Sequence, residues 1–264
     1  MARIITIANN KGGVGKTTTA VSMGAALRLR GYDVLIIDYD GQANATDALR
    51  AATSGGTTYD AMKAKHTPYV QPARVLNPQG GAGVLDVLPS CFDVSALESE
   101  LSTQPDRVTR FSTVADKYRD KYDVVIVDTP PALGLLTISA LYAADEMIIA
   151  VQPQYMAVKG LLQLNDAVTT VSTNRGVPVG VYVLFTQYDR RKSLHRLTVE
   201  QVTGAGFRTF DTKIRDNVAL GEAPAVGVDI FRYAPRSNGA QDYDALTDEY
   251  LNAHKLRHLK HGYK

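Results

Sequence analysis

The chain has 264 residues, of which 45% are hydrophobic and 21% are charged, and its formal net charge is +2. This composition is typical of a folded domain and excludes disordered, collagen-like and coiled-coil chains. The single cysteine, Cys91, excludes an intramolecular disulfide, a four-cysteine zinc site and an iron–sulfur cluster that needs two cysteines from each subunit. No early apolar run reaches about 18 residues, the length that suggests a membrane span. We therefore expect a protein of the reducing cytosol.

Six short apolar runs rich in β-branched residues predict strands, at residues 4–7, 34–37, 84–88, 124–127, 147–151 and 179–185. Their hydrophobicity is continuous rather than alternating, which indicates strands buried on both faces, as in a parallel sheet. Helical spacing lies between them, most clearly over residues 17–30 and 160–171. This alternation predicts an α/β fold with a doubly wound, mostly parallel sheet flanked by helices.

Residues 51–83 interrupt this pattern with pairs of glycines, several prolines and a weak helix over residues 59–65. A helix this short cannot fold alone. We interpret the segment as an excursion from one domain that spans residues 1–264.

A glycine-rich segment, N-N-K-G-G-V-G-K-T-T at residues 9–18, directly follows the first predicted strand and precedes a helical pattern. In such a loop the backbone N–H groups surround phosphate oxygens, the last lysine reaches the β and γ phosphates, and the next hydroxyl can bind Mg²⁺. The segment therefore predicts a nucleotide site at Gly12, Gly13, Val14, Gly15, Lys16, Thr17 and Thr18. Asn10 replaces the first glycine of the general motif, and Lys11 adds a second cation.

Acidic residues end two of the predicted strands. Asp38 and Asp40 follow the second strand at alternate positions, so they point to one side of an extended chain. Asp128 ends the strand at residues 124–127. Phosphoryl transfer needs a metal ion and a positioned water, and ligands of this kind lie at the carboxyl ends of parallel strands. These acids are the candidates for both tasks, with Asp128 as a Mg²⁺ ligand.

The string K-G-G-V-G-K-T-T resembles the deviant Walker A motif of the ParA/MinD family of P-loop ATPases. Further matches follow in family order and cover nearly the whole chain: residues 42–46, 85–90, 129–131, 151–155, 187–191, 221–224 and 234–240. The chain is identified as a ParA/Soj-like partition ATPase of the short form, without an amino-terminal helix-turn-helix domain. Gly41 departs from the family, which usually has proline there, and this change is expected to loosen the first switch region.

The resemblance implies roles for individual residues. Lys11, Lys16 and Asp40 would be catalytic: Lys11 reaches the partner's ATP in a nucleotide-sandwich homodimer, and Asp40 orients the attacking water. Thr17, Asp38 and Asp128 would hold Mg²⁺. Gln187 and Pro235 would border the adenine ring of ATP.

Positive charge gathers toward the carboxyl terminus. Residues 186–264 carry thirteen Lys or Arg against ten Asp or Glu, whereas residues 1–185 carry sixteen against seventeen. Clustered basic side chains bind phosphate backbones without reading bases. The resemblance implies non-specific binding of double-stranded DNA, with Arg191 at a position where the family often has a DNA-contacting arginine. Further candidates from the basic region are Arg190, Lys192, Arg196 and Arg215. A second position that is often basic in Soj-like proteins is Ala219 here.

The resemblance implies DNA partition: an ATP-dependent dimer holds nucleoid DNA in the cytoplasm, and a ParB-like partner stimulates hydrolysis and release. A ParA-like ATPase that positions a protein or organelle cargo remains an alternative, as does a small-molecule ligase resembling dethiobiotin synthetase. A nitrogenase iron protein is excluded because the chain has only one cysteine, Cys91. The tail leaves two further alternatives. His254, His258 and His261 share a helical face that could hold a metal, and Tyr250, Leu251, Leu256 and Leu259 could form a MinD-like membrane helix, although packing of this helix on the sheet is favoured.

Overall fold

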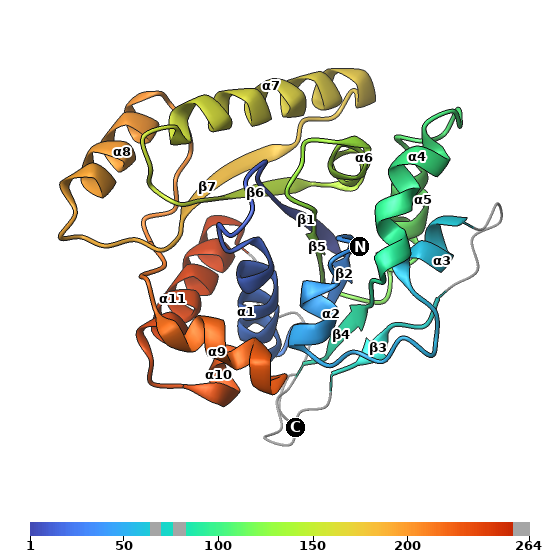
Figure 1. Cartoon of the computed structure of the whole chain (residues 1–264), viewed down its shortest axis with the longest axis horizontal. Helices are drawn as coiled ribbons and strands as arrows, with labels where there is room; N and C mark the ends of the chain where they lie inside the picture. The colour runs from blue at the N-terminus through green and yellow to red at the C-terminus, as the bar shows by residue number, and fades with distance from the viewer. Residues whose placement is uncertain (64–69, 76–82, 256–264) are drawn as a thin grey trace.

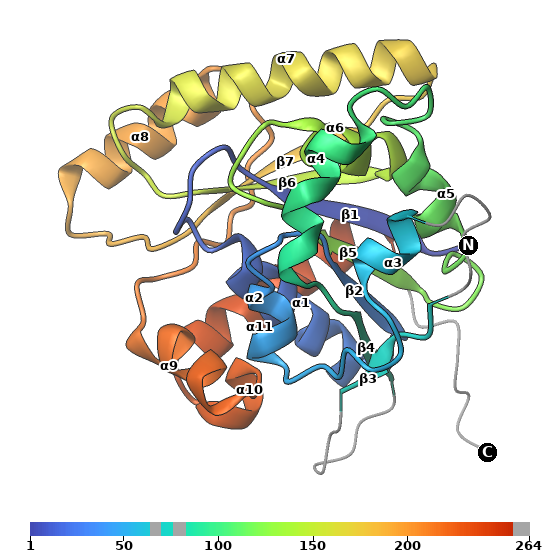
Figure 2. The ribbon, with the colours of Figure 1, turned by 45° about the vertical axis from the view of Figure 1, so that its right-hand side comes forward.

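The structure, a computed structural model, describes residues 1–63, 70–75 and 83–255, and a seven-stranded sheet forms the centre of this part (Figure 1, Figure 2). The strand order is β3-β4-β2-β5-β1-β6-β7. The strands are β1 (Arg3–Ala8), β2 (Val34–Asp38), β3 (Ala73–Arg74), β4 (Leu85–Leu88), β5 (Val124–Asp128), β6 (Glu146–Val151) and β7 (Gly180–Phe185). Neighbouring strands from β4 to β7 are parallel, and β3 pairs antiparallel with β4 at the edge.

The six predicted strands are confirmed, and each bound differs from the prediction by no more than one residue. The edge strand β3 was not predicted, because it is two residues long and lies in the Gly- and Pro-rich excursion, where the sequence shows no period. The predicted helix at residues 59–65 is confirmed as far as Lys63. Residues 64 and 65 lie outside the described part of the chain.

Helices connect the strands and cover both faces of the sheet. They are α1 (Lys16–Leu29), α2 (Asn44–Ala48), α3 (Thr58–Lys63), η1 (Phe92–Ala96), α4 (Leu97–Leu101), α5 (Arg110–Asp116), α6 (Leu135–Ala143), α7 (Ala157–Arg175), α8 (Ser193–Gly204), α9 (Val218–Val226), α10 (Ile230–Tyr233) and α11 (Asn238–Ala253). The two helices predicted most clearly, over residues 17–30 and 160–171, correspond to α1 and α7.

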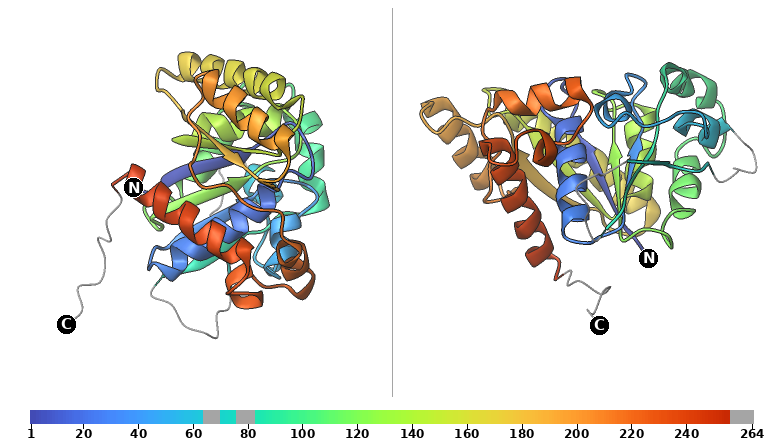
Figure 3. Two further views of the ribbon diagram at one scale, coloured as in Figure 1. Left: turned by 90° about the vertical axis from the view of Figure 1, so that its left-hand side faces the viewer. Right: turned by 90° about the horizontal axis from the view of Figure 1, so that it is seen from below.

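The core has two layers because side chains alternate along each strand. On one face, α1 and α11 pack side by side over inward residues such as Ile5 and Ile36. On the other face, α4 to α8 pack over the alternate residues, such as Ile4 and Ile149. Figure 3 shows the sheet between these layers. Burial on both faces explains the continuous apolar runs in the sequence.

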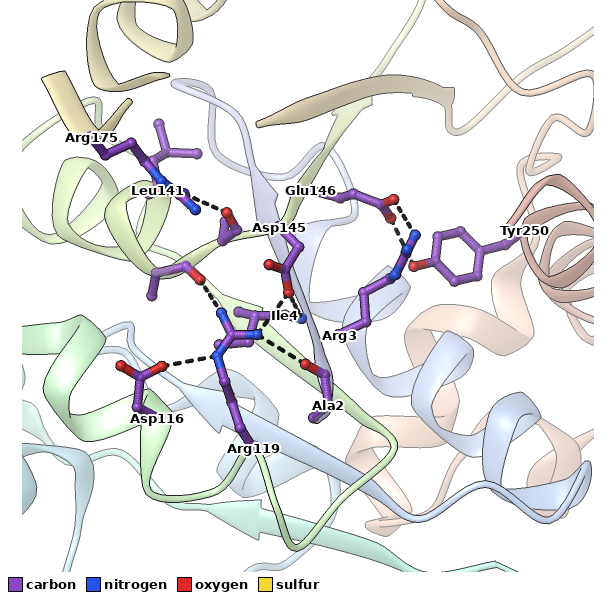
Figure 4. Close-up of polar contacts among 12 residues, drawn as sticks. Ala2, Arg3, Ile4, Asp116, Arg119, Leu141, Asp145, Glu146, Arg175 and Tyr250 are labelled. Carbon is purple, nitrogen blue, oxygen red and sulfur yellow. Dashed lines mark hydrogen bonds and ion pairs between the residues drawn. The ribbon is translucent and has the colours of Figure 1, made fainter. Parts of the chain in front are cut away.

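Two arginines stabilise the carboxyl end of α6 (Figure 4). Arg119 donates to the carbonyl of Ala143 at 3.0 Å, and Arg175 donates to the carbonyl of Leu141 at 3.1 Å. The last carbonyls of a helix lack partners within it, and cations near them are favourable. These contacts fix the connection from α6 to β6 at the end of the sheet opposite the glycine-rich loop.

Candidate nucleotide site

The glycine-rich loop connects β1 to α1, as the sequence predicts. Gly15 has a φ of +86° and precedes the first residue of α1, a left-handed conformation that strains any residue with a side chain. Lys16 begins the helix and is 7% exposed, and its Nζ donates to the carbonyl of Lys11 at 3.2 Å. Burial lowers the pKa of Lys16, while the nearby Asp128 and Asp40 oppose this change. The loop thus folds around a buried ammonium group.

Asp38 and Asp128 lie side by side at the carboxyl ends of β2 and β5, where they are partners in the strand register. Both side chains are fully buried. The Asp38 carboxylate accepts hydrogen bonds from the backbone N of Thr46 at 2.8 Å and from its Oγ1 at 2.7 Å. Neither carboxylate oxygen of Asp128 has a hydrogen-bond partner among the described residues.

The pKa of both acids reflects this burial. Burial raises the pKa of Asp38 and of Asp128, and the negative charge of Asp38 raises that of Asp128 further. The Thr17 hydroxyl and the Lys16 ammonium oppose the rise at Asp128. A divalent cation prefers oxygen ligands. An unpartnered buried carboxylate beside the Thr17 hydroxyl and the Asp38 carboxylate therefore fits Mg²⁺.

A cavity of about 520 Å³, here called the main cavity, opens above these acids. Six of the seven predicted phosphate-loop residues line it, and the seventh, Val14, is buried behind the loop. Asp40 and Pro131 line its wall, while α2, α9 and α10 form the opposite side. The structure therefore brings Lys16, Thr17 and Asp40 to one cavity, with Asp38 and Asp128 buried beneath.

A neighbouring cavity of about 320 Å³, the side cavity, shares Gly15, Thr18, Gln187 and Leu220 with the main cavity. It continues along residues 214–218, which the sequence analysis did not assign to the site. The matched segment at residues 221–224 pointed to this part of the chain without giving it a role. Gln187 lies where the two cavities meet, whereas the exposed Pro235 lines neither of them in the described structure.

Lys11 lies on the other side of the loop. It lines a third cavity of about 350 Å³, the α7 cavity, between the loop and the start of α7. Its ammonium group contacts Oε1 of Gln154. The Nε2 of the same amide donates to Oε1 of Gln152 at 2.8 Å. In this structure the Lys11 side chain therefore lies outside the main cavity, although its carbonyl accepts the hydrogen bond from Lys16.

Four of the predicted DNA-binding residues lie together at the start of α8. Arg190, Arg191, Lys192 and Arg196 are all exposed. Arg191 pairs with Asp189 at 2.9 Å, and these hydrogen bonds hold the pKa of Asp189 below its ordinary value. The four cations form a compact exposed cluster.

The fifth residue, Arg215, has a different environment. Its Nε and Nη2 donate to the carboxylate of Asp242 at 3.0 and 2.7 Å, which ties the segment before α9 to α11. Arg191 makes the same two-point contact with Asp189, but its side chain is 87% exposed against 45% for Arg215, so Arg215 is the less available of the two to a DNA phosphate.

His254 contributes to the core rather than to a metal site. It lies near Glu146, with Nε2 at 2.6 Å from a carboxylate oxygen, and its Nδ1 lies 2.7 Å from the carbonyl of Tyr250. Arg3 and the Tyr250 hydroxyl also bind Glu146, as Figure 4 shows. Both ring nitrogens already have oxygen partners, so the described part of the structure does not support the metal alternative at this histidine.

The rest of the tail is only partly described. Tyr250 is buried and Leu251 packs against the core, as the favoured alternative predicts. His258, His261, Leu256 and Leu259 lie outside the described residues. In the part that the structure covers, no helix has the length and apolar character needed to cross a membrane.

Residues 2–177 match the AAA domain family. The chain is 39% identical over 254 residues to the sporulation initiation inhibitor protein Soj of Bacillus subtilis (strain 168), which covers 94% of this chain and 98% of Soj. It is 36% identical over 256 residues to the chromosome-partitioning ATPase Soj of Treponema pallidum (strain Nichols), at 95% and 98% coverage.

Its fold is similar to that of cobyrinic acid a,c-diamide synthase from Mycobacterium smegmatis with a bound ATP analogue and magnesium. The TM-score is 0.81, with 27% identity over 97% of this chain and 96% of that chain. Taken with the parallel sheet and the phosphate loop, these likenesses show that the chain belongs to the AAA domain family and, within it, to the Soj/ParA-type P-loop ATPases of chromosome partition.

Proposed function

We propose that the chain is an ATPase of DNA partition, with residues 1–264 acting as one ATPase domain that binds ATP and Mg²⁺. The observation that carries this proposal is the unpartnered buried carboxylate of Asp128, in register with Asp38 beneath the Lys16 loop. A buried carboxylate without a donor is costly. Mg²⁺ held by Thr17, Asp38 and Asp128 would supply a counter-charge and offset that cost.

The position of each residue in the site indicates its role in hydrolysis. The N–H groups of residues 12–18 and the Lys16 ammonium bind and orient the phosphates. Thr17, Asp38 and Asp128 would hold Mg²⁺, which when bound neutralises charge on the β and γ phosphates. Asp40, which lines the main cavity, orients the attacking water. Residues 214–218 and Gln187 bind the base in the side cavity.

The proposal includes a nucleotide-dependent pair of subunits. Lys11 lies outside the main cavity and contacts Gln154, and its role in this proposal is to bind the nucleotide of a second copy in place of that amide. Joining two copies would bring together two clusters of Arg190, Arg191, Lys192 and Arg196 for non-specific DNA binding. A ParB-like protein would stimulate hydrolysis and release of the DNA. In this role the protein would act in the cytoplasm, on the nucleoid.

Binding to a non-specific DNA duplex, measured with ATP, ADP and no nucleotide at 50 and 200 mM salt, tests this proposal. Two clusters contain eight cations, so affinity should fall about a thousandfold or more between the two salt concentrations. We expect DNA binding only with ATP. Equal binding without nucleotide would contradict the ATP gate, and binding to anionic vesicles instead of DNA would favour the membrane alternative.

A further inference from the structure

Gly41 follows Asp40, and its backbone is packed against η1, the short helix after β4. A β-carbon placed at Gly41 would lie 1.9 Å from Oγ of Ser95, 3.0 Å from its Cβ and 2.9 Å from its backbone N. Carbon atoms pack best at about 3.5–4.0 Å. Position 41 therefore has no room for a side chain. The glycine permits a close contact between the first switch segment, residues 40–46, and η1.

Ser90 holds the same segment at two points. This serine is 2% exposed and lies just before η1. Its Oγ donates to the carbonyl of Asp40 at 2.6 Å, and its backbone N donates to Oγ1 of Thr46 at 2.8 Å. Thr46 in turn donates to Asp38. Both ends of the first switch segment are thus tied to the β4–η1 connection.

These contacts fix the backbone on both sides of the Asp40 side chain. The backbone N of Asp40 donates to Asp38 at 3.3 Å, and its carbonyl accepts from Ser90 and from the backbone N of Ala43. The carboxylate itself accepts from the backbone N of Gln42 at 3.0 Å. The direction in which it enters the main cavity is therefore set by contacts that the nucleotide does not make.

We propose that Ser90 is a positioning residue for Asp40: together with the close packing of Gly41 against Ser95, it holds the peptide between Asp40 and Gly41 so that the carboxylate faces the attacking water. This proposal rests on the proposed function, because the orientation of Asp40 matters only if the chain hydrolyses ATP. Neither serine lines the main cavity, so neither acts by touching the nucleotide. The sequence predicts that Gly41 loosens the first switch segment. The structure favours the opposite effect, because the glycine lets η1 pack closely against this segment.

A steric test uses Gly41→Ala, alone and combined with Ser95→Ala. The single variant should lower kcat for ATP hydrolysis by about tenfold to a hundredfold, because small displacements of catalytic groups are this costly. Affinity for a fluorescent ATP analogue should stay within about threefold, since the phosphate loop is unchanged. The double variant should recover part of the lost kcat, because the nearest atom is removed while the Ser95 backbone N remains. Gly204→Ala is the matched control, since a β-carbon there meets open space.

Ser90→Ala provides a second, independent variant that creates no clash. It should lower kcat with little change in analogue binding or in melting temperature. The proposal is overturned if Gly41→Ala folds and turns over ATP at the wild-type rate, or if Ser95→Ala gives no recovery. If Gly41→Ala fails to fold, a wild-type kcat in Ser90→Ala overturns it instead.

Asp40→Asn separates this proposal from the function on which it rests. If Asp40→Asn binds the ATP analogue but no longer hydrolyses ATP, the role of Asp40 is supported, and the serine variants then decide the positioning. Hydrolysis at the wild-type rate in Asp40→Asn overturns both that role and the positioning. The proposed ATPase function fails only if the unmodified chain binds no nucleotide or hydrolyses none.

Discussion

Asp128→Asn should stabilise the nucleotide-free protein although it alters the proposed metal site. The wild-type carboxylate is fully buried, and no hydrogen bond to it is found among the described residues. A buried polar group left unpaired costs about 1–3 kcal/mol, and more when it is charged. Because the pKa of Asp128 is raised, folding near neutral pH either buries the charge or takes up a proton, and a neutral amide of the same shape avoids both costs. We therefore expect the free energy of unfolding to rise by about 2 kcal/mol.

The expected change can be measured by thermal melting in EDTA without nucleotide. In a protein of this size, about 1 kcal/mol corresponds to about 2–4 °C in melting temperature. Asp128→Asn should thus melt about 6 °C higher than the wild type. The same variant should lose the Mg²⁺ dependence of ATP-analogue binding, because the cation loses a charged ligand. A stable protein with a defective site is the usual result when a functional group is buried at a cost.

Asp38→Asn is the matched control, because it makes the same substitution at the partner position in the sheet register. Both variants relieve the repulsion between the two acids. Asp38→Asn also weakens the two charge-assisted hydrogen bonds from Thr46, at 2.7 and 2.8 Å. At Asp128 the described structure offers one such group, the Thr17 hydroxyl, without a formed hydrogen bond. Asp38→Asn should therefore melt below Asp128→Asn and near or below the wild type. Equal melting temperatures for the two variants, or a lower value for Asp128→Asn than for the wild type, would refute this reasoning.

Three further predictions concern the surface and the loop. Lys11→Ala should bind ATP normally but lose ATP-dependent dimerisation, measured by light scattering, because Lys11 lies outside the main cavity; lost ATP binding would contradict this. Arg196→Glu should weaken DNA binding and make it less dependent on salt. Arg215→Ala should mainly lower the melting temperature, because it breaks the contact with Asp242. If Arg215→Ala weakens DNA binding and Arg196→Glu does not, the DNA binds at Arg215 instead. Burial lowers the pKa of His195, whose Nδ1 accepts from the backbone N of Asp189 at 3.0 Å. Unfolded histidine binds protons more readily, so stability should fall as the pH drops below about 6.5, and His195→Asn should lose this dependence if the argument is correct.

The sequence predicts those parts of the site that depend on local order along the chain. The glycine-rich loop must lie between β1 and α1, because a strand and a helical pattern flank it directly. Asp38 and Asp128 end two parallel strands, so the fold class alone predicts that both lie at the same edge of the sheet, where the strands end. Their adjacency needs the strand order as well, and β2 and β5 are neighbours although they are far apart in sequence.

Other features depend on partners that no local pattern reveals. Arg215 belongs to a basic region by composition, yet Asp242 on α11 binds its guanidinium. His254 shares a helical spacing with two other histidines, yet Glu146 on β6 lies against its ring. In both cases a distant acid already contacts the side chain, so the residue is less available to an outside ligand. Such pairings follow from the way α11 crosses the sheet face, which composition does not encode.

The arrangement of the cavities separates two roles of the phosphate loop. Lys16 lines the main cavity and Lys11 lines the α7 cavity, so the two cations of one loop serve opposite sides of it. A chain that only bound and hydrolysed nucleotide would need the first cation alone. The second contacts a neutral amide, Gln154, whereas a phosphate oxygen would give the Lys11 ammonium a partner of opposite charge. A phosphate presented by another copy could therefore displace the amide, which would couple nucleotide binding to assembly.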